Sequence, residues 1–176
     1  IATPSFLDGR PKLLFIDGKT TPAQAGVIFQ TINPTTGTVL ADVAEADAVD
    51  VDRAVAAARR ALEGPWARFK PFDRQQVMLN LADLVERHFD ELAMLDTLDM
   101  GAPISRTTLG RRRAVGLLRF YAGLATSVHG ETIANSVAGE VFSYTLKEPV
   151  GVVGAINPWN GPIGLAIWKL CPVLAS

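Results

Sequence analysis

The sequence between residues 149 and 176 restricts the fold more than any other part of the chain. Its first stretch, 150–156, reads Val-Gly-Val-Val-Gly-Ala-Ile and lacks the polar/apolar alternation of a half-exposed strand. Such a run is typical of a strand that is buried on both faces of a parallel sheet. A loop over 157–161 follows, and Pro162 suits the first position of a helix. We therefore predict a strand–loop–helix unit of an α/β protein.

Helices are expected to fill most of the chain before that unit. Three segments repeat apolar residues at helical spacing: 47–63, 73–98 and 103–126. Asp47 is expected to cap the first helix, and Gly64-Pro65 to end it. Asp73 followed by Gln76 resembles a capping box at the start of the second helix.

Two regions are expected to form antiparallel hairpins. Segments 13–17 and 27–32 are short, apolar and bounded by turn residues, so we predict that they pair with each other. Within 130–147, Phe142 and Tyr144 alternate with polar residues, which predicts a second hairpin. A protruding hairpin exposes strand edges that a partner strand would cover, whereas the alternative is an ordinary edge hairpin.

Composition excludes several classes of function. A net charge of −1 and a pI near 6.1 argue against binding driven by the charge of nucleic acid or an anionic membrane. One cysteine excludes an internal disulfide framework, and two distant histidines make no metal motif. No run of about 20 apolar residues predicts a membrane span. With no export signal in view, we expect a cytoplasmic protein without metal, nucleic-acid or membrane partners.

The loop before the last helix is the best candidate for a functional site. In open α/β sheets, ligands bind beyond the carboxyl ends of the strands, where a helix N-terminus offers free N–H groups. Asn160 lies in this loop, and its amide is a neutral donor that could stabilise an oxyanion. The alternative is a tight turn in which Asn160 caps the helix and Trp159 packs in the core. Gly151 and Gly154 alone are a weak dinucleotide signal, and close packing explains them equally well.

Several motifs of the chain resemble the aldehyde dehydrogenase superfamily. The most specific are E-P-V-G-V-V-G at 148–154, I-N-P-W-N at 156–160 and W-K-L at 168–170. Weaker matches follow the family's order at 31–37, 98–103 and 120–123. The likeness extends from about Leu13 onward and implies that residues 1–176 are the N-terminal part of the family's Rossmann-like cofactor-binding domain. It also implies that the 130–147 hairpin is an oligomerisation arm, in a homodimer or homotetramer.

The resemblance implies oxidation of an aldehyde to a carboxylic acid with NAD or NADP. In the family a cysteine thiolate forms a thiohemiacetal and then a thioester, which a glutamate-activated water hydrolyses. Asn160 matches the family's oxyanion donor. The nucleophile and the general base have no match here, so this fragment alone is expected to be inactive and poorly stable. The alternatives are a non-catalytic binding or assembly module, and a semialdehyde dehydrogenase that acylates coenzyme A.

The same resemblance assigns roles to neighbouring residues. Four are expected to line the nicotinamide-ribose side of the cofactor site: Ile156, Asn157, Pro158 and Trp159. Lys169 is placed beside the cofactor, with a salt bridge as the alternative. Trp168 and Gly161 are placed in the substrate tunnel. Gly161 stands where the family usually has Phe, which predicts a wider entrance and a bulkier substrate.

Three other features are expected to carry no chemistry. Cys171 lies on an apolar helical run and is interpreted as a buried core residue, not as the nucleophile. Arg111–Arg113 are interpreted as a solvated helix face or a subunit contact, with phosphate binding as the alternative. Asp99 is interpreted as a helix-end carboxylate, with a cation site as the alternative.

Overall fold

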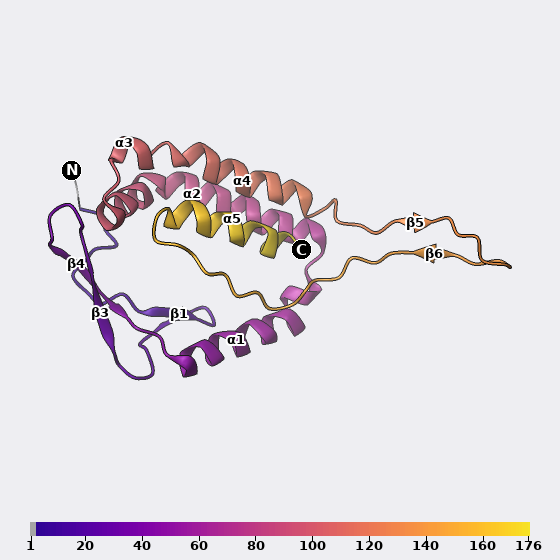
Figure 1. Ribbon diagram of the computed structural model, residues 1–176, viewed down its shortest axis with the longest axis horizontal. Helices are drawn as coiled ribbons and strands as arrows, with labels where there is room; N and C mark the ends of the chain where they lie inside the picture. The colour runs from indigo at the N-terminus through magenta and orange to yellow at the C-terminus, as the bar shows by residue number, and fades with distance from the viewer. Residues whose placement is uncertain (1–2) are drawn as a thin grey trace.

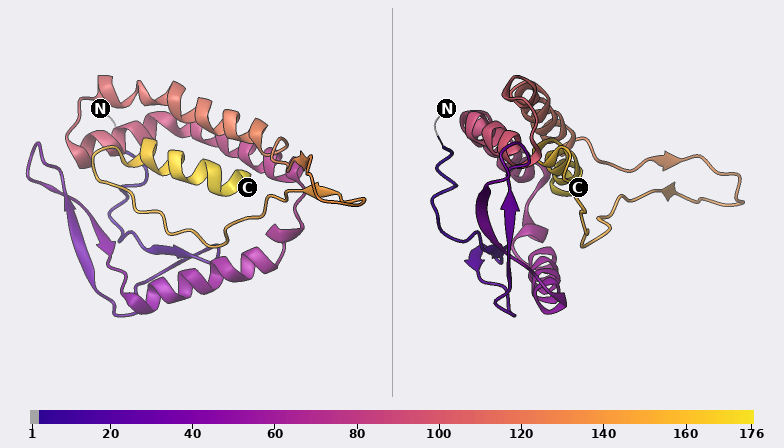
Figure 2. Two further views of the ribbon diagram at one scale, coloured as in Figure 1. Left: turned by 45° about the vertical axis from the view of Figure 1, so that its right-hand side comes forward. Right: turned by 60° about the vertical axis from the view of Figure 1, so that its left-hand side comes forward.

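A computed structural model describes residues 3–176 and shows a layer of helices, a strand-rich N-terminal part and a long protruding hairpin (Figures 1 and 2). The strands are β1 (Leu14–Ile16), β2 (Lys19–Thr21), β3 (Ile28–Ile32), β4 (Val39–Ala44), β5 (Thr132–Ile133) and β6 (Ser143–Tyr144). The helices are α1 (Ala48–Glu63), α2 (Pro71–Met100), α3 (Ile104–Thr107), α4 (Gly110–Leu124) and α5 (Pro162–Ala175), with a 3₁₀ turn, η1 (Trp66–Arg68). No helix among residues 3–176 is long and apolar enough to cross a membrane.

The core lies where α2, α4 and α5 pack side by side (Figure 1). Met78 and Phe89 from α2, Leu118 from α4, and Ile167 and Cys171 from α5 are buried in it. Alanines on all three helices share this cluster, and their small side chains let the helix axes approach closely. This layer supports the start of α5, and therefore the loop before it.

The two ends of the long helix α2 are set by capping residues close to them in the sequence. Pro71 occupies its first turn, and the Asp73 carboxylate accepts a hydrogen bond from the backbone N–H of Lys70 at 2.9 Å. The helix therefore begins two residues before the predicted start, and Asp73 closes the box backward toward Lys70 rather than starting one with Gln76. Gly101 ends the helix in the left-handed region at φ 74°, which glycine adopts without strain.

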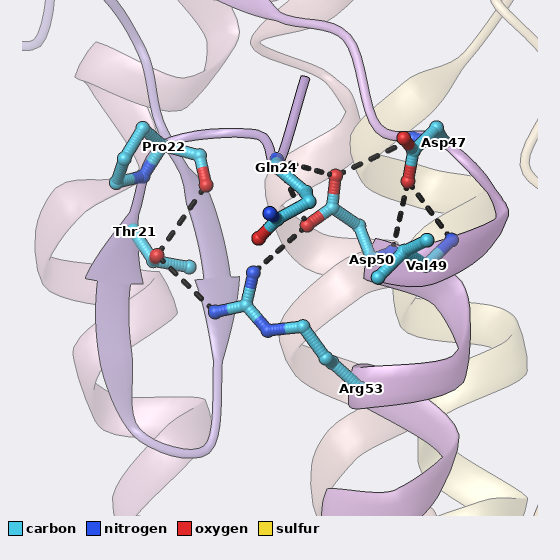
Figure 3. Close-up of polar contacts among 7 residues, drawn as sticks. All are labelled: Thr21, Pro22, Gln24, Asp47, Val49, Asp50 and Arg53. Carbon is cyan, nitrogen blue, oxygen red and sulfur yellow. Dashed lines mark hydrogen bonds and ion pairs between the residues drawn. The ribbon is translucent and has the colours of Figure 1, made fainter. Parts of the chain in front are cut away.

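Helix α1 is capped as predicted and is anchored by a buried carboxylate (Figure 3). Asp47 accepts hydrogen bonds from the N–H groups of Val49 and Asp50, at 2.9 and 3.1 Å. Asp50 is only 1% exposed. Its carboxylate accepts from the Gln24 N–H at 3.0 Å and pairs with Arg53 at 2.9 Å. The predicted apolar stripe of α1 is poorly covered, since Val51 stays 55% exposed.

The N-terminal strands pair differently from the prediction. Strand β1 pairs with β2, and β3 pairs with β4, each in an antiparallel two-stranded sheet. The predicted pairing of 13–17 with 27–32 is therefore wrong. The physical reason is the Asp17-Gly18 turn, in which both residues have positive φ, because it folds β1 directly back onto 19–21.

The predicted helix over 103–126 is interrupted. The structure has a single turn, α3, and then α4 from Gly110. Between them the hydroxyl of Thr108 donates to the carbonyl of Ile104 at 2.8 Å. Such side-chain bonds compete with the helical ladder, and Gly110 further weakens a continuous helix at this point.

The hairpin predicted within 130–147 is confirmed and projects away from the helical layer (Figure 1). Strand β5 pairs with β6, with Thr132 opposite Tyr144. Its apolar side chains face solvent, and Phe142 is 74% exposed. This part of the chain therefore offers an uncovered apolar surface.

The predicted buried strand at 150–156 is not formed. The segment is extended but has no strand assignment, and Val150 and Ile156 are 92% and 88% exposed. A parallel strand needs neighbours on both edges to accept and donate its backbone hydrogen bonds. Within residues 3–176 no strand lies in that position, so the sequence pattern of a buried strand is present without its sheet.

Candidate functional site

A pocket of about 330 Å³ lies between the C-terminal half of α2, the α3–α4 region and the start of α5. It brings together three residues that the sequence placed in the site, Asn160, Gly161 and Trp168. Ten more residues line it: Asp96, Met100, Arg106, Thr107, Gly110, Arg113, Ala114, Leu117, Gly164 and Leu165. The pocket is therefore a mixed polar and apolar site at a helix N-terminus.

Asn160 is exposed at the end of the loop that leads into α5. The N-cap of this helix is Gly161, and no side-chain hydrogen bond caps it. The alternative in which Asn160 caps the helix is therefore wrong. Trp159 is 80% exposed, so it does not pack in the core either. The amide of Asn160 is left available to a ligand in the pocket.

Asp96, which sequence reasoning missed, lies half-buried beside the start of α5. Burial raises the pKa of its carboxyl group to about 6, and the nearby charge of Asp99 acts in the same direction. The backbone N–H of Ile163 opposes this rise by stabilising the carboxylate.

Arg113 lies over the indole ring of Trp168, and both residues line the pocket. Its guanidinium lies 4.6 Å from the centre of the indole ring. Arg112 and Arg113 are exposed, as expected for a solvated helix face, and Arg111 pairs with Asp90 at the surface; the contact of Arg113 with Trp168 was not predicted. The signal was present in the sequence. Arg106, Gly110, Arg113 and Leu117 recur at the spacing of one helical face.

The residues expected on the cofactor side form an exposed loop outside this pocket. Ile156, Asn157, Pro158 and Trp159 all face solvent. The ammonium group of Lys169 donates to the carbonyl oxygen of Ile156, which ties α5 to that loop. The alternative role of Lys169 in a salt bridge finds no support in the described part of the chain, where its partner is a carbonyl.

Cys171 is buried, as the sequence predicted. Burial raises the pKa of its thiol to about 11, so the nucleophilic thiolate is scarce at neutral pH. Elsewhere in residues 3–176, no three His, Cys, Asp or Glu side chains gather where they could hold a metal ion. The chemistry that the pocket can offer on its own is hydrogen bonding, charge and shape.

Comparison with known proteins gives the family. The model of the aldehyde dehydrogenase family matches residues 20–176. DhaS of Bacillus subtilis (strain 168), a candidate aldehyde dehydrogenase, is 49% identical over 98% of this chain and 34% of its own length. The mitochondrial benzaldehyde dehydrogenase of Antirrhinum majus is 46% identical over 92% of this chain and 30% of its own. The chain belongs to the aldehyde dehydrogenase family.

Solved structures agree with this assignment. The NAD⁺ complex of an aldehyde dehydrogenase from Bacillus cereus superposes with a TM-score of 0.92 at 42% identity, covering 97% of this chain and 35% of that one. The chain thus spans about a third of the length of its relatives, and its fold is an incomplete α/β domain of this family. The missing sheet around 150–156 is consistent with that incompleteness.

Proposed function

We propose that the protein containing this chain oxidises an aldehyde to a carboxylic acid with NAD or NADP. The observation that carries the proposal is the position of Asn160, whose uncommitted amide lines a pocket with Trp168 in a chain of the aldehyde dehydrogenase family. Residues 1–176 supply part of the site. The thiolate nucleophile and the general-base carboxylate come from elsewhere in the protein.

Asn160 acts on the charge that develops during the reaction. When a thiolate attacks the aldehyde carbon, the carbonyl oxygen becomes an oxyanion, and the Asn160 amide N–H donates a hydrogen bond to it. A neutral donor that is fixed at the pocket is suited to this task, because it needs no proton transfer. The backbone of the α5 helix, resting on the buried layer with α2 and α4, holds the loop that positions this amide.

The loop 156–159 and Lys169 are suited to hold the nicotinamide end of the cofactor. The loop is extended, exposed and fixed at one point by the bond from Lys169 to the Ile156 carbonyl. Support for a nicotinamide cofactor comes from the Bacillus cereus relative, which was solved as an NAD⁺ complex. The cofactor accepts the hydride when bound. The chain's own contribution is to orient the ring, with Trp159 offering a flat face.

Gly161 is proposed to widen the entrance to the substrate pocket. A Cβ built there would meet only Leu165, at an ordinary 3.5 Å. The first atom of a larger side chain therefore has room at this position. We expect Gly161→Phe to discriminate against bulky aldehydes while it retains activity on small ones.

The hairpin of residues 130–147 is proposed as the arm through which subunits associate. It projects from the helical layer (Figure 2). Its Phe142 and Tyr144 are exposed, and the centres of their rings lie 5.6 Å apart. A second copy could cover this surface and complete its strand edges. A homodimer or homotetramer and a cytoplasmic location stay predictions.

The experiment is an assay of the full-length protein with NAD and NADP and aldehydes of increasing bulk. We expect aldehyde-dependent NAD(P)H formation, lowered about 10²–10³-fold in kcat by Asn160→Ala, because one oxyanion donor is lost. Asn80→Ala is the matched control, since this asparagine is exposed on α2 far along the helix from the pocket. Residues 1–176 alone are expected to be inactive.

The same assay separates the alternatives. No turnover by a folded full-length protein would overturn the proposal in favour of a non-catalytic module. Turnover that requires coenzyme A, with an acyl thioester as the product, would identify a CoA-acylating enzyme instead. An Asn160→Ala variant as active as the wild type would exclude Asn160 as the oxyanion donor.

A further inference from the structure

Two arginines line the pocket without a carboxylate partner. Seven ion pairs occur within residues 3–176, and none includes Arg106 or Arg113. On helix α4, Arg111 pairs with Asp90 and Arg119 pairs with Asp83 and Glu86, whereas Arg112, outside the pocket, also has no ion pair within residues 3–176. Arg106 on α3 and Arg113 on α4 therefore leave their charges available to a ligand in the pocket.

The Arg113 guanidinium is oriented by the indole ring of Trp168. Stacking 4.6 Å from the ring centre uses one face of the planar group. The N–H groups point outward in the guanidinium plane, where they match the two oxygens of a carboxylate. A stacked guanidinium also loses less side-chain freedom on binding than a free one, which favours recognition.

The charges in the pocket are separated along helix α5. Asp96 lines the pocket near the first turn of α5. Trp168 lies seven residues beyond Gly161, which corresponds to about 10 Å along a helix axis. A negative group on a ligand is thus attracted to the Arg113 end of the pocket, away from Asn160.

We infer that the pocket selects aldehydes that carry a carboxylate at the end remote from the aldehyde, with Arg113 binding that carboxylate and Arg106 adding positive charge. The inference rests on the proposed function, which places the aldehyde carbon beside Asn160. The apolar lining residues Met100, Leu117 and Leu165 then surround the carbon chain that joins the two ends. The separation of the two ends favours a long or rigid spacer over a short one.

The test compares ω-oxo carboxylates of increasing chain length, each beside its neutral methyl ester, as substrates of the full-length protein. We expect the wild type to prefer the acids, and the ratio of kcat/KM for acid over ester to fall about 10–100-fold in Arg113→Met. The loss is expected mainly in KM. Arg113→Lys keeps the positive charge but loses the paired N–H donors of the planar guanidinium, and should retain part of the preference for acids over esters.

Arg112→Met is the matched control, because it removes the same charge one residue away, on a side chain that does not line the pocket. It should leave the ratio unchanged. An equal fall of the ratio in both variants would show that general charge, not a specific contact, sets the preference, and would overturn the inference. A wild type that uses esters as well as acids would overturn it too.

A binding measurement keeps this inference distinct from the proposed function. Calorimetric titration of the full-length protein with adipate, a dicarboxylate that cannot be oxidised here, needs no turnover. Binding that Arg113→Met weakens about 10-fold or more, and Arg112→Met does not, supports the carboxylate site even if no aldehyde is oxidised. Binding that is absent, or equal in all three proteins, overturns it.

Discussion

The helical layer and the segment 148–161 both contain many apolar residues, but those of the helical layer are buried and those of the segment are exposed. Met78, Leu118 and Cys171 are fully buried between α2, α4 and α5. Val150 and Ile156, at the two ends of a strand-like sequence, and Trp159 in the loop that follows are all at least 80% exposed. A helix satisfies its own backbone hydrogen bonds and needs only side-chain cover. A strand needs neighbours for its backbone as well, so its burial depends on other segments.

The largest expected effect lies in the helical layer. Leu118→Ala removes a fully buried side chain and leaves a cavity, so it should lower the free energy of unfolding by about 2–5 kcal/mol. Urea denaturation of the full-length protein, followed by circular dichroism, measures the loss. Phe120→Ala on the same helix is the control, since Phe120 is 60% exposed and should cost much less. Equal losses would contradict the burial described for α4.

The next effect tests whether α1 is held by one buried carboxylate rather than by apolar cover. Asp50→Asn weakens the ion pair with Arg53 and the acceptor for the Gln24 N–H (Figure 3), so we expect a loss of about 1–3 kcal/mol. The same denaturation experiment applies. Asp52→Asn, two residues away and exposed, is the control. A loss below that of the control would show that α1 is held by another contact.

A smaller effect depends on pH and concerns the edge of the helical layer. Because the pKa of Asp96 is raised from 3.8 to about 6, the folded state holds a proton that the unfolded state has lost between these values. This group therefore makes stability fall as pH rises from about 4 to about 6, and has no further effect above. Solvent screening reduces the size of this change in stability, because Asp96 is only half-buried.

Asp96→Asn should remove that dependence. The difference between the two stability–pH curves isolates Asp96, since the lowered pKa values of Asp8, beside Lys12, and of Glu91, beside the Ser5 hydroxyl, act in both proteins. Those two groups change stability in the opposite direction, losing their stabilisation as pH falls. Curves that stay parallel between pH 4 and 6 would contradict the environment described for Asp96.

The smallest effect on stability is expected in the exposed segment. Replacing Val150 and Ile156 together by serine should change the free energy of unfolding by less than about 0.5 kcal/mol, because neither side chain is covered. Light scattering should show that the same change reduces aggregation, since it removes exposed apolar surface. A clear loss of stability would mean that this segment packs against the chain after all.

The same contrast explains how far the sequence alone could predict the fold. The caps of α1 and the start of α5 at Pro162 follow from local residue chemistry, and both were predicted. The predicted partner of β1 was wrong, because the sequences of two apolar segments do not determine which of several strands each one pairs with. The strand expected at 150–156 needs partner strands, and residues 3–176 place none beside it.

The candidate site likewise contains residues that the sequence indicated and residues that it did not. A motif within one short stretch indicated Asn160, Gly161 and Trp168, and the pocket does bring them together. Asp96 and Arg113 come from two other helices, and only the packing of α2, α4 and α5 places them beside that stretch. Nothing in a single sequence fixes that packing. Helical spacing could indicate that Arg113 and Arg106 share a face, but not which other helix packs against that face.

The burial of Cys171 turns it into a reporter of motion in the helical layer. A thiol reagent reaches it only when α5 separates from α2 and α4, since its side chain has no exposed surface in the folded state. The rate of alkylation, measured against that of the unfolded chain, therefore gives the free energy of this opening. In the full-length protein, a cysteine that reacts rapidly under native conditions must lie outside this core, so a brief labelling pulse would distinguish exposed thiols from Cys171.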